Sequence, residues 1–305
     1  MNPEKNRIQQ RQRPHFRSHN LIREALVVLF CSQLSDTPSM PEPPSAQPRE
    51  TVQMHAFQVS ISPDLRRLIG PEGEIALQEV AQAYAQVFGC PHPQIQIVLD
   101  DFSEETQELG GGIREHVAEK ADSGIIFFDR NNLIANRDSL DNLLRHIQET
   151  VLHAMTHACK PTEPKLMPPF LLGDGARVLG VRGFAILAAL PDGKRGSLMT
   201  IEEGASEALA AILAKRLKVR FTVSVEYYFA IGSFTLALMQ HLRLNPVRLA
   251  KMVQANDLMG FVGLVFNTSD PSDEQLVQLM TLYEDMREDL DPKMALERVK
   301  QMRQR

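Results

Sequence analysis

Two histidines four residues apart are the side chains of this chain best suited to chemistry. His153 and His157 lie in the stretch Glu149–Ala158, whose apolar spacing predicts an amphipathic helix. Residues four apart lie on the same helical face, about one turn apart, so both imidazoles can reach one metal ion. The pair alone is weak evidence for a metal site, because histidines at this spacing also occur on ordinary helices.

A third ligand is expected from a second predicted helix, which begins near residue 201. Its first turns carry Glu202, Glu203 and Glu207, and Gly204 would let another helix approach closely. A carboxylate joined to two imidazoles leaves a fourth position open on zinc, as catalytic zinc sites require. The choice among the three glutamates stays open, although Glu202 has the position of a solvated first-turn charge favoured by the helix N-terminus.

The order strand, helix with H-x-x-x-H, helix with E-G-x-x-E resembles the gluzincin branch of zinc metallopeptidases. The resemblance covers roughly residues 95–265, and it is specific in the order of elements and in the E-G step. It implies a zincin-like fold with a Zn²⁺ cofactor. By this resemblance His153, His157 and Glu203 would hold the zinc ion, and Glu207 would orient one of the histidines.

The same resemblance implies a peptide or protein substrate in extended conformation. Such a substrate would pair with a strand before the histidine helix, for which residues 124–129 and 133–135 are the candidates. A tyrosine on the helix after the glutamates could stabilise an oxyanion. Tyr228 is preferred to Tyr227 for this role, against the more ordinary interpretation of both as packing or surface residues.

One position departs from the family pattern, because Ala154 stands where H-E-x-x-H peptidases carry glutamate. That glutamate is the general base, and its loss typically costs on the order of 10²–10⁴ in rate. The sequence therefore predicts the machinery of metal-assisted peptide hydrolysis in a catalytically impaired form. It is either an inactivated variant of an active enzyme or a natural pseudoprotease that binds peptides or proteins. A metal-free helical scaffold is the third alternative.

The elements expected around these residues give an α+β protein with a small mixed sheet lobe and a helical C-terminal lobe. Gly, Pro and apolar spacing set the expected bounds. Strands are expected over 57–61, 94–99, 124–129 with 133–135, and around 178–187; helices are expected over 72–88, 139–159, 201–217, 225–242, 246–254, 258–266 and 273–301.

Three regions are expected along the chain. Residues 1–50 combine a basic tail, a short apolar segment and a proline-rich linker. Residues 51–136 form an α/β N-terminal lobe, and residues 137–305 carry the metal-site helices and the helical lobe, which together make one catalytic-type domain. Residues 21–34 are a possible signal or weak membrane segment. The compartment therefore stays open between the cytoplasm and secretion.

Composition limits the classes of protein. The 305 residues are 43% hydrophobic and 23% charged, which is ordinary for a soluble globular protein. The net charge of −5 argues against a general nucleic-acid binder, and no apolar run reaches the roughly 18 residues of a membrane span. Three cysteines are too few for a disulfide framework, so Cys159 is expected to be a free thiol.

Overall fold

The structure, a computed structural model, describes residues 57–100, 119–122, 124–172, 175–191, 193, 195–219, 221, 226–286 and 291–303. All of them belong to one compact unit, residues 42–305. The expected tail, the segment 21–34 and the proline-rich linker lie outside the described residues. Among the described helices, none has the length and apolar character needed to cross a bilayer.

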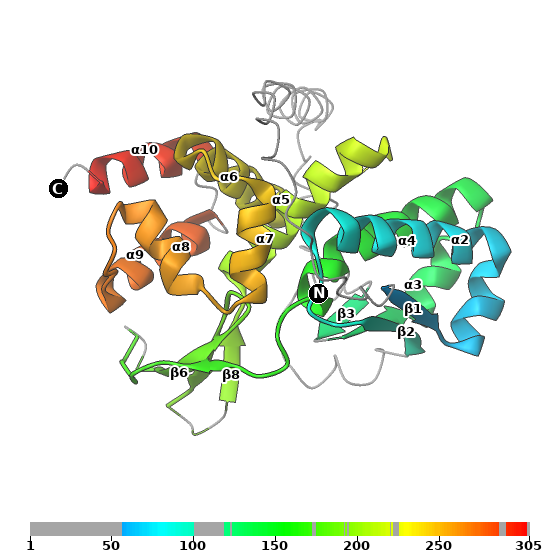
Figure 1. The fold of residues 1–305 in the computed structure, drawn as a ribbon, viewed down its shortest axis with the longest axis horizontal. Helices are drawn as coiled ribbons and strands as arrows, with labels where there is room; N and C mark the ends of the chain where they lie inside the picture. The colour runs from blue at the N-terminus through cyan, green and yellow to red at the C-terminus, as the bar shows by residue number, and fades with distance from the viewer. Residues whose placement is uncertain are drawn as a thin grey trace, which may run out of the picture. The chain divides into compact units, whose positions relative to one another are not determined.

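A four-stranded mixed sheet, here called sheet A, begins the described chain (Figure 1). Strands β1 (Gln58–Ile61), β2 (Gln94–Asp100) and β4 (Ile125–Asp129) are parallel, and β3 (Glu119–Asp122) runs antiparallel to β4 at one edge. The strand order is β1-β2-β4-β3. The structure confirms the mixed sheet and the strands predicted at 57–61 and 94–99.

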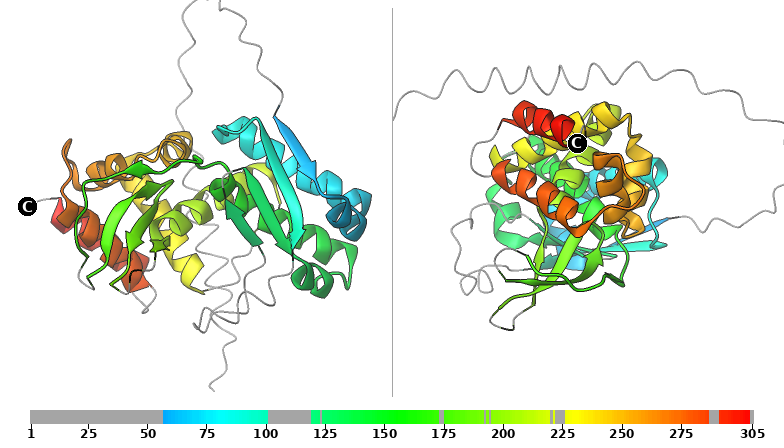
Figure 2. Two further views of the ribbon diagram at one scale, coloured as in Figure 1. Left: turned by 90° about the horizontal axis from the view of Figure 1, so that it is seen from below. Right: turned by 90° about the vertical axis from the view of Figure 1, so that its left-hand side faces the viewer.

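Two long helices cover one face of sheet A (Figure 2). Helix α2 (Pro63–Phe88) begins earlier than expected, because the Ser62 hydroxyl caps it and it continues through a kink at Gly70, where φ is 71°. Helix α4 (Leu140–Ala158) is capped by Ser139 and ends at Cys159, which confirms the predicted histidine helix.

The structure confirms a strand at 124–129, namely β4, but the strand predicted at 133–135 is wrong. Strand β4 is interior, paired with β2 on one side and β3 on the other. Residues 133–135 belong to a short helix, α3 (Arg130–Ala135), whose Leu133 is fully buried in the core. The three polar residues after β4 therefore start a helical turn instead of a second strand, and the strands at the edges of the described sheet are β1 and β3.

A second sheet, sheet B, follows α4 and was not expected. It is antiparallel, in the order β5 (Lys165–Leu166), β6 (Arg177–Arg182), β7 (Ala185–Ala189) and β8 (Arg195–Leu198). The single strand predicted around 178–187 is a hairpin, because Gly183 turns the chain with a φ of 66°. Glycine is the residue that adopts this left-handed conformation without steric cost.

The rest of the described chain is helical, as predicted. The helices are α5 (Thr200–Leu217), α6 (Glu226–Leu242), α7 (Pro246–Gln254), α8 (Leu258–Phe266), α9 (Asp273–Asp285) and α10 (Pro292–Met302). The single helix expected over 273–301 is two helices, since Pro292 cannot continue a helix but suits the first position of a new one capped by Asp291. The structure confirms an α+β protein.

Glycines let α6 pack closely against α5. A Cβ on Gly204 would lie 2.6 Å from the ring of Tyr283 and 2.7 Å from the Thr235 hydroxyl. On the facing helix, a Cβ on Gly232 would lie 2.7 Å from the Cβ of Glu207. The close approach predicted at Gly204 is confirmed, and it fixes the helix that carries the glutamates.

A disulfide joins Cys90, just after α2, to Cys159 at the end of α4. The expectation of a free thiol at Cys159 is therefore wrong. The two residues are 69 positions apart, and no local spacing in the sequence indicates that the fold brings them together.

Candidate metal centre

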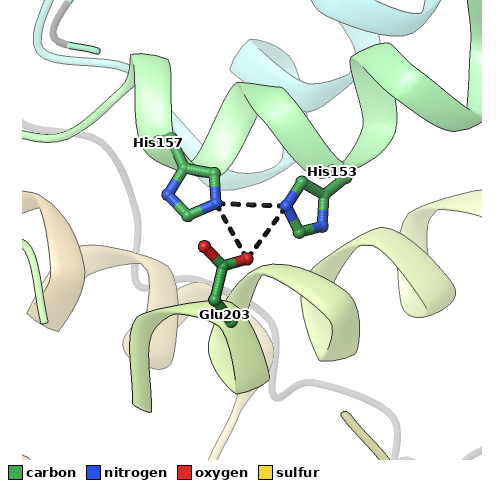
Figure 3. A group of neighbouring side chains, drawn as sticks. All are labelled: His153, His157 and Glu203. Carbon is green, nitrogen blue, oxygen red and sulfur yellow. Dashed lines mark hydrogen bonds and ion pairs between the residues drawn. The ribbon is translucent and has the colours of Figure 1, made fainter. Parts of the chain in front are cut away.

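Three side chains from α4 and α5 converge on one point. His153 and His157 project from α4 toward Glu203 on α5 (Figure 3). The two Nε2 atoms are 3.2 Å apart, and the Oε2 atom of Glu203 lies 3.1 Å from Nε2 of His153 and 3.4 Å from Nε2 of His157. Among the described residues, these three form the only cluster of potential metal ligands.

The separations of these atoms suit a small tetrahedral ion. Zinc bonds of about 2.0–2.1 Å with tetrahedral angles place neighbouring ligand atoms about 3.3–3.4 Å apart. The observed separations of 3.1 to 3.4 Å are close to that value. Two imidazole nitrogens and one carboxylate oxygen are also the donor types that zinc and related transition metals accept, whereas calcium and magnesium prefer oxygen alone. The three residues therefore fit a metal ion.

Each histidine presents its other ring nitrogen to a second carboxylate. Nδ1 of His157 lies 2.7 Å from Oε1 of Glu202, and Nδ1 of His153 lies 2.9 Å from Oε1 of Glu207. The His157 contact is a hydrogen bond, whereas the His153 contact is close but not aligned as one. Because a carboxylate only accepts hydrogen bonds, a neutral His157 carries its proton on Nδ1. Its Nε2 lone pair is then directed at the shared point, the arrangement typical of metal-bound histidines.

Glu202 is buried, which corrects the expectation of a solvated charge. Its side chain has no solvent exposure. Oε2 accepts hydrogen bonds from the backbone N–H groups of Phe184 and Ala185, at 2.9 and 2.8 Å, while Oε1 faces His157 and the ammonium of Lys160. Burial of a charged carboxylate is tolerated here because each oxygen faces two donors.

The side of the centre near His153 is the more open side. The His153 and Glu203 side chains are 17% and 15% exposed, compared with 5% for His157. The ring of Tyr228, on α6, lies edge-on to His153 with the ring centroids 6.0 Å apart. Solvent therefore contacts the centre more on the His153 side than on the His157 side.

In the protein without a metal ion, Glu202 and Glu203 determine the protonation of His157. Burial works to lower the pKa of His157, but the charges and hydrogen bonds of Glu203 and Glu202 outweigh it and raise that pKa to about 9. Burial conversely works to raise the pKa of Glu203, and the two histidines hold it far below its usual range. The three atoms thus need a positive charge among them, either a proton on His157 or a metal cation that displaces it.

The Ala154 position is closed. Its side chain has no solvent exposure and belongs to the main hydrophobic core. A general base must exchange protons with water or substrate, so the structure has at this position neither the base nor an opening to the solvent that such a base would use.

Three further histidines among the described residues, His92, His146 and His241, do not belong to this cluster. His146, two turns before His153 on α4, is mostly buried, and the burial lowers its pKa. His92 contacts the Lys160 carbonyl oxygen at 2.8 Å, and His241 is exposed on α6. The side chain of Tyr227 lies outside the described part of the structure, as does the glycine-rich stretch 109–112.

Sequence reasoning missed Lys160, Ser206 and the role of Glu202. The Ser206 hydroxyl lies 3.3 Å from Nε2 of His157 and donates to the Glu202 carbonyl at 2.9 Å. One signal for Glu202 was present: α5 is apolar or small on nearly all sides, and such helices are buried. A glutamate on a buried helix needs a partner. Nothing in the spacing pointed to Lys160.

Comparison of this chain with protein-family models, with curated proteins and with solved structures found no match. The likeness to gluzincins is therefore a likeness of motif and element order, and the functional argument depends on the geometry of the centre.

Proposed function

We propose that this chain is a zinc protein of the metallopeptidase type, with zinc held by His153, His157 and Glu203, in which Ala154 leaves peptide hydrolysis impaired. One observation carries the proposal. Three ligand atoms from two helices lie 3.1 to 3.4 Å from one another, the spacing of neighbouring ligands around a tetrahedral ion.

The residues around the centre have separate roles in this proposal. Zinc, when bound, supplies Lewis-acid chemistry by polarising a carbonyl and making water more acidic. Glu207 and Glu202 orient the two histidines through Nδ1. Tyr228 would donate a hydrogen bond to an oxyanion on the open side of His153. Strand β3, at the edge of sheet A, would pair with an extended peptide.

The missing step is proton transfer. Peptide hydrolysis requires a group that takes a proton from water and gives one to the leaving amine. Ala154 can do neither, and the rate is expected to fall by about 10²–10⁴ relative to a form with glutamate there.

A second candidate function is a pseudoprotease that binds peptides without cleaving them. The complete burial of Ala154 favours it, since a side chain at this position has no access to water. Ala154→Glu, checked by circular dichroism for retained folding because the position is buried in the core, separates the two functions. Appearance of peptidase activity in a peptide-library assay supports the impaired enzyme. Retained zinc without activity, together with peptide binding, supports the pseudoprotease.

Metal content tests the proposal itself. Purified protein is incubated with zinc, dialysed and analysed by mass spectrometry of the elements, alongside His157→Ala and the exposed control His241→Ala. We expect one zinc per chain in the wild type and in the control, and none in His157→Ala. A wild-type protein that retains no metal would support the metal-free scaffold, with the positive charge of the centre supplied by a proton on His157.

A further inference from the structure

Lys160 is a buried cation that the proposed zinc chemistry does not use. Its side chain is 4% exposed, and its Nζ atom lies 3.1 Å from Oε1 of Glu202. Lysine is almost never this buried unless it is paired. The two residues are 42 positions apart, so the pair joins the segment after α4 to the first turn of α5.

Four donors fix the carboxylate of Glu202. His157 and Lys160 approach Oε1, and the backbone N–H groups of Phe184 and Ala185 donate to Oε2. The turn of the β6–β7 hairpin lies so close that a Cβ on Gly183 would collide with this carboxylate. Among these four donors, Lys160 is the charged group that is not itself a proposed metal ligand.

The backbone around Lys160 is itself held in place. The Lys160 carbonyl oxygen contacts Nε2 of His92 at 2.8 Å, and the preceding residue, Cys159, is bonded to Cys90. The N–H of Gly124 donates to the Ala158 carbonyl at 2.8 Å. The ammonium therefore reaches Glu202 from an anchored stretch of chain.

We propose that Lys160 is a positioning residue for the metal centre, which acts through Glu202 on His157. By holding Oε1 of Glu202 in place, Lys160 keeps the His157 ring in the orientation that directs Nε2 at the metal. The proposal rests on the zinc site proposed above. Groups that orient metal ligands typically contribute 10–100-fold to metal affinity.

The test compares zinc affinity in Lys160→Met with that in Lys165→Met, a control at an exposed lysine five residues further along. Affinity is measured by competition with a chromophoric chelator, and the ligand geometry by the visible absorption spectrum of the Co²⁺-substituted protein. We expect Lys160→Met to weaken zinc binding about 10–100-fold and to change the Co²⁺ spectrum. We expect Lys165→Met to change neither. Lys160→Gln, which keeps a donor, replaces Lys160→Met if circular dichroism shows that the latter does not fold.

A double-mutant cycle with Glu202→Gln tests the route of the effect. If Lys160 acts through Glu202, Lys160→Met adds little to the loss of affinity already caused by Glu202→Gln. Additive losses would overturn the proposal, and so would a Lys160→Met protein that melts earlier but binds zinc with wild-type affinity and spectrum. A wild-type protein without zinc would instead overturn the proposed function.

Discussion

The inner half of the metal centre is more deeply buried than the outer half. The inner half consists of His157, Glu202 and Lys160, and all three side chains are 5% exposed or less. Its carboxylate receives two backbone hydrogen bonds besides its contacts with the histidine and the lysine. The disulfide and the β6–β7 hairpin both adjoin it.

The outer half consists of His153, Glu207 and Tyr228. Glu207 reaches His153 through Oε1, while its Oε2 atom has no hydrogen-bond partner among the described residues. His153 is also the more exposed histidine. The comparison indicates that the inner half is anchored through Glu202 and that solvent contacts the centre mainly at His153.

The two ligand histidines give the largest expected difference. His157→Ala and His153→Ala should both abolish zinc retention, since each removes a ligand. In the metal-free state, however, His157→Ala should lower the free energy of unfolding by about 1–3 kcal/mol, because Glu202 loses a buried partner. We expect His153→Ala to cost less, since the His153 side chain is the more exposed of the two. Urea unfolding with a chelator present measures both, and equal losses would remove the distinction between the halves.

Removing the disulfide tests the inner half without changing any of its three residues. Replacing both Cys90 and Cys159 by alanine should lower the free energy of unfolding by about 2–4 kcal/mol, because the unfolded chain regains freedom. Zinc affinity should also fall, since the stretch that carries Lys160 loses one of its anchors. Wild-type protein treated with dithiothreitol should show the same changes, while the double variant should not respond to dithiothreitol. Peptide mapping without reductant checks the bond itself, and recovery of both cysteines as free thiols would refute it.

Glu207→Gln sharpens the comparison from the outer side. Glutamine keeps the shape of the side chain but removes the negative charge beside Nδ1 of His153, so zinc affinity should fall about 10–100-fold. The melting temperature of the metal-free protein should change little, because glutamine preserves the packing against Gly232. Glu202→Gln is the matched variant of the inner half. It should lose both zinc affinity and stability, since Lys160 would then be buried beside a neutral group.

The features that the sequence predicts correctly are local patterns, and the features that it misses are contacts between distant residues. The spacing of His153 and His157 and the Glu203-Gly204 step are local patterns, and the structure brings these side chains together as that pattern predicts. The pairing of Cys90 with Cys159 and of Lys160 with Glu202 joins residues 69 and 42 positions apart. No periodicity within an element encodes such pairs.

The errors in the predicted fold have the same cause. Sheet B was not expected, since its β6–β7 hairpin depends on the turn at Gly183. That turn packs against the carboxylate of Glu202. It is also held by Asn256, whose Oδ1 accepts a hydrogen bond from the Gly183 N–H at 2.6 Å. Glu202 was expected to be a solvated charge because its partners lie elsewhere in the chain, at the end of α4 and in the hairpin of sheet B. Both the hairpin and the burial of Glu202 thus depend on tertiary contacts.

Tyr228→Phe gives the smallest expected effect and tests whether the outer half receives a ligand. The Tyr228 ring packs edge-on against His153, and phenylalanine would preserve that packing. Zinc affinity and melting temperature should therefore stay near the wild-type values. Binding of a hydroxamate-capped peptide, measured by titration calorimetry on the zinc-loaded protein, should weaken by about 0.5–1.5 kcal/mol, the contribution of one hydrogen bond.

Tyr283→Phe is the matched control, because the Tyr283 hydroxyl is buried against Thr235 at 2.7 Å. That variant should lose stability and keep peptide binding. If Tyr228→Phe bound the peptide as tightly as the wild type, the hydroxyl would face no ligand, and the open side of His153 would need another explanation.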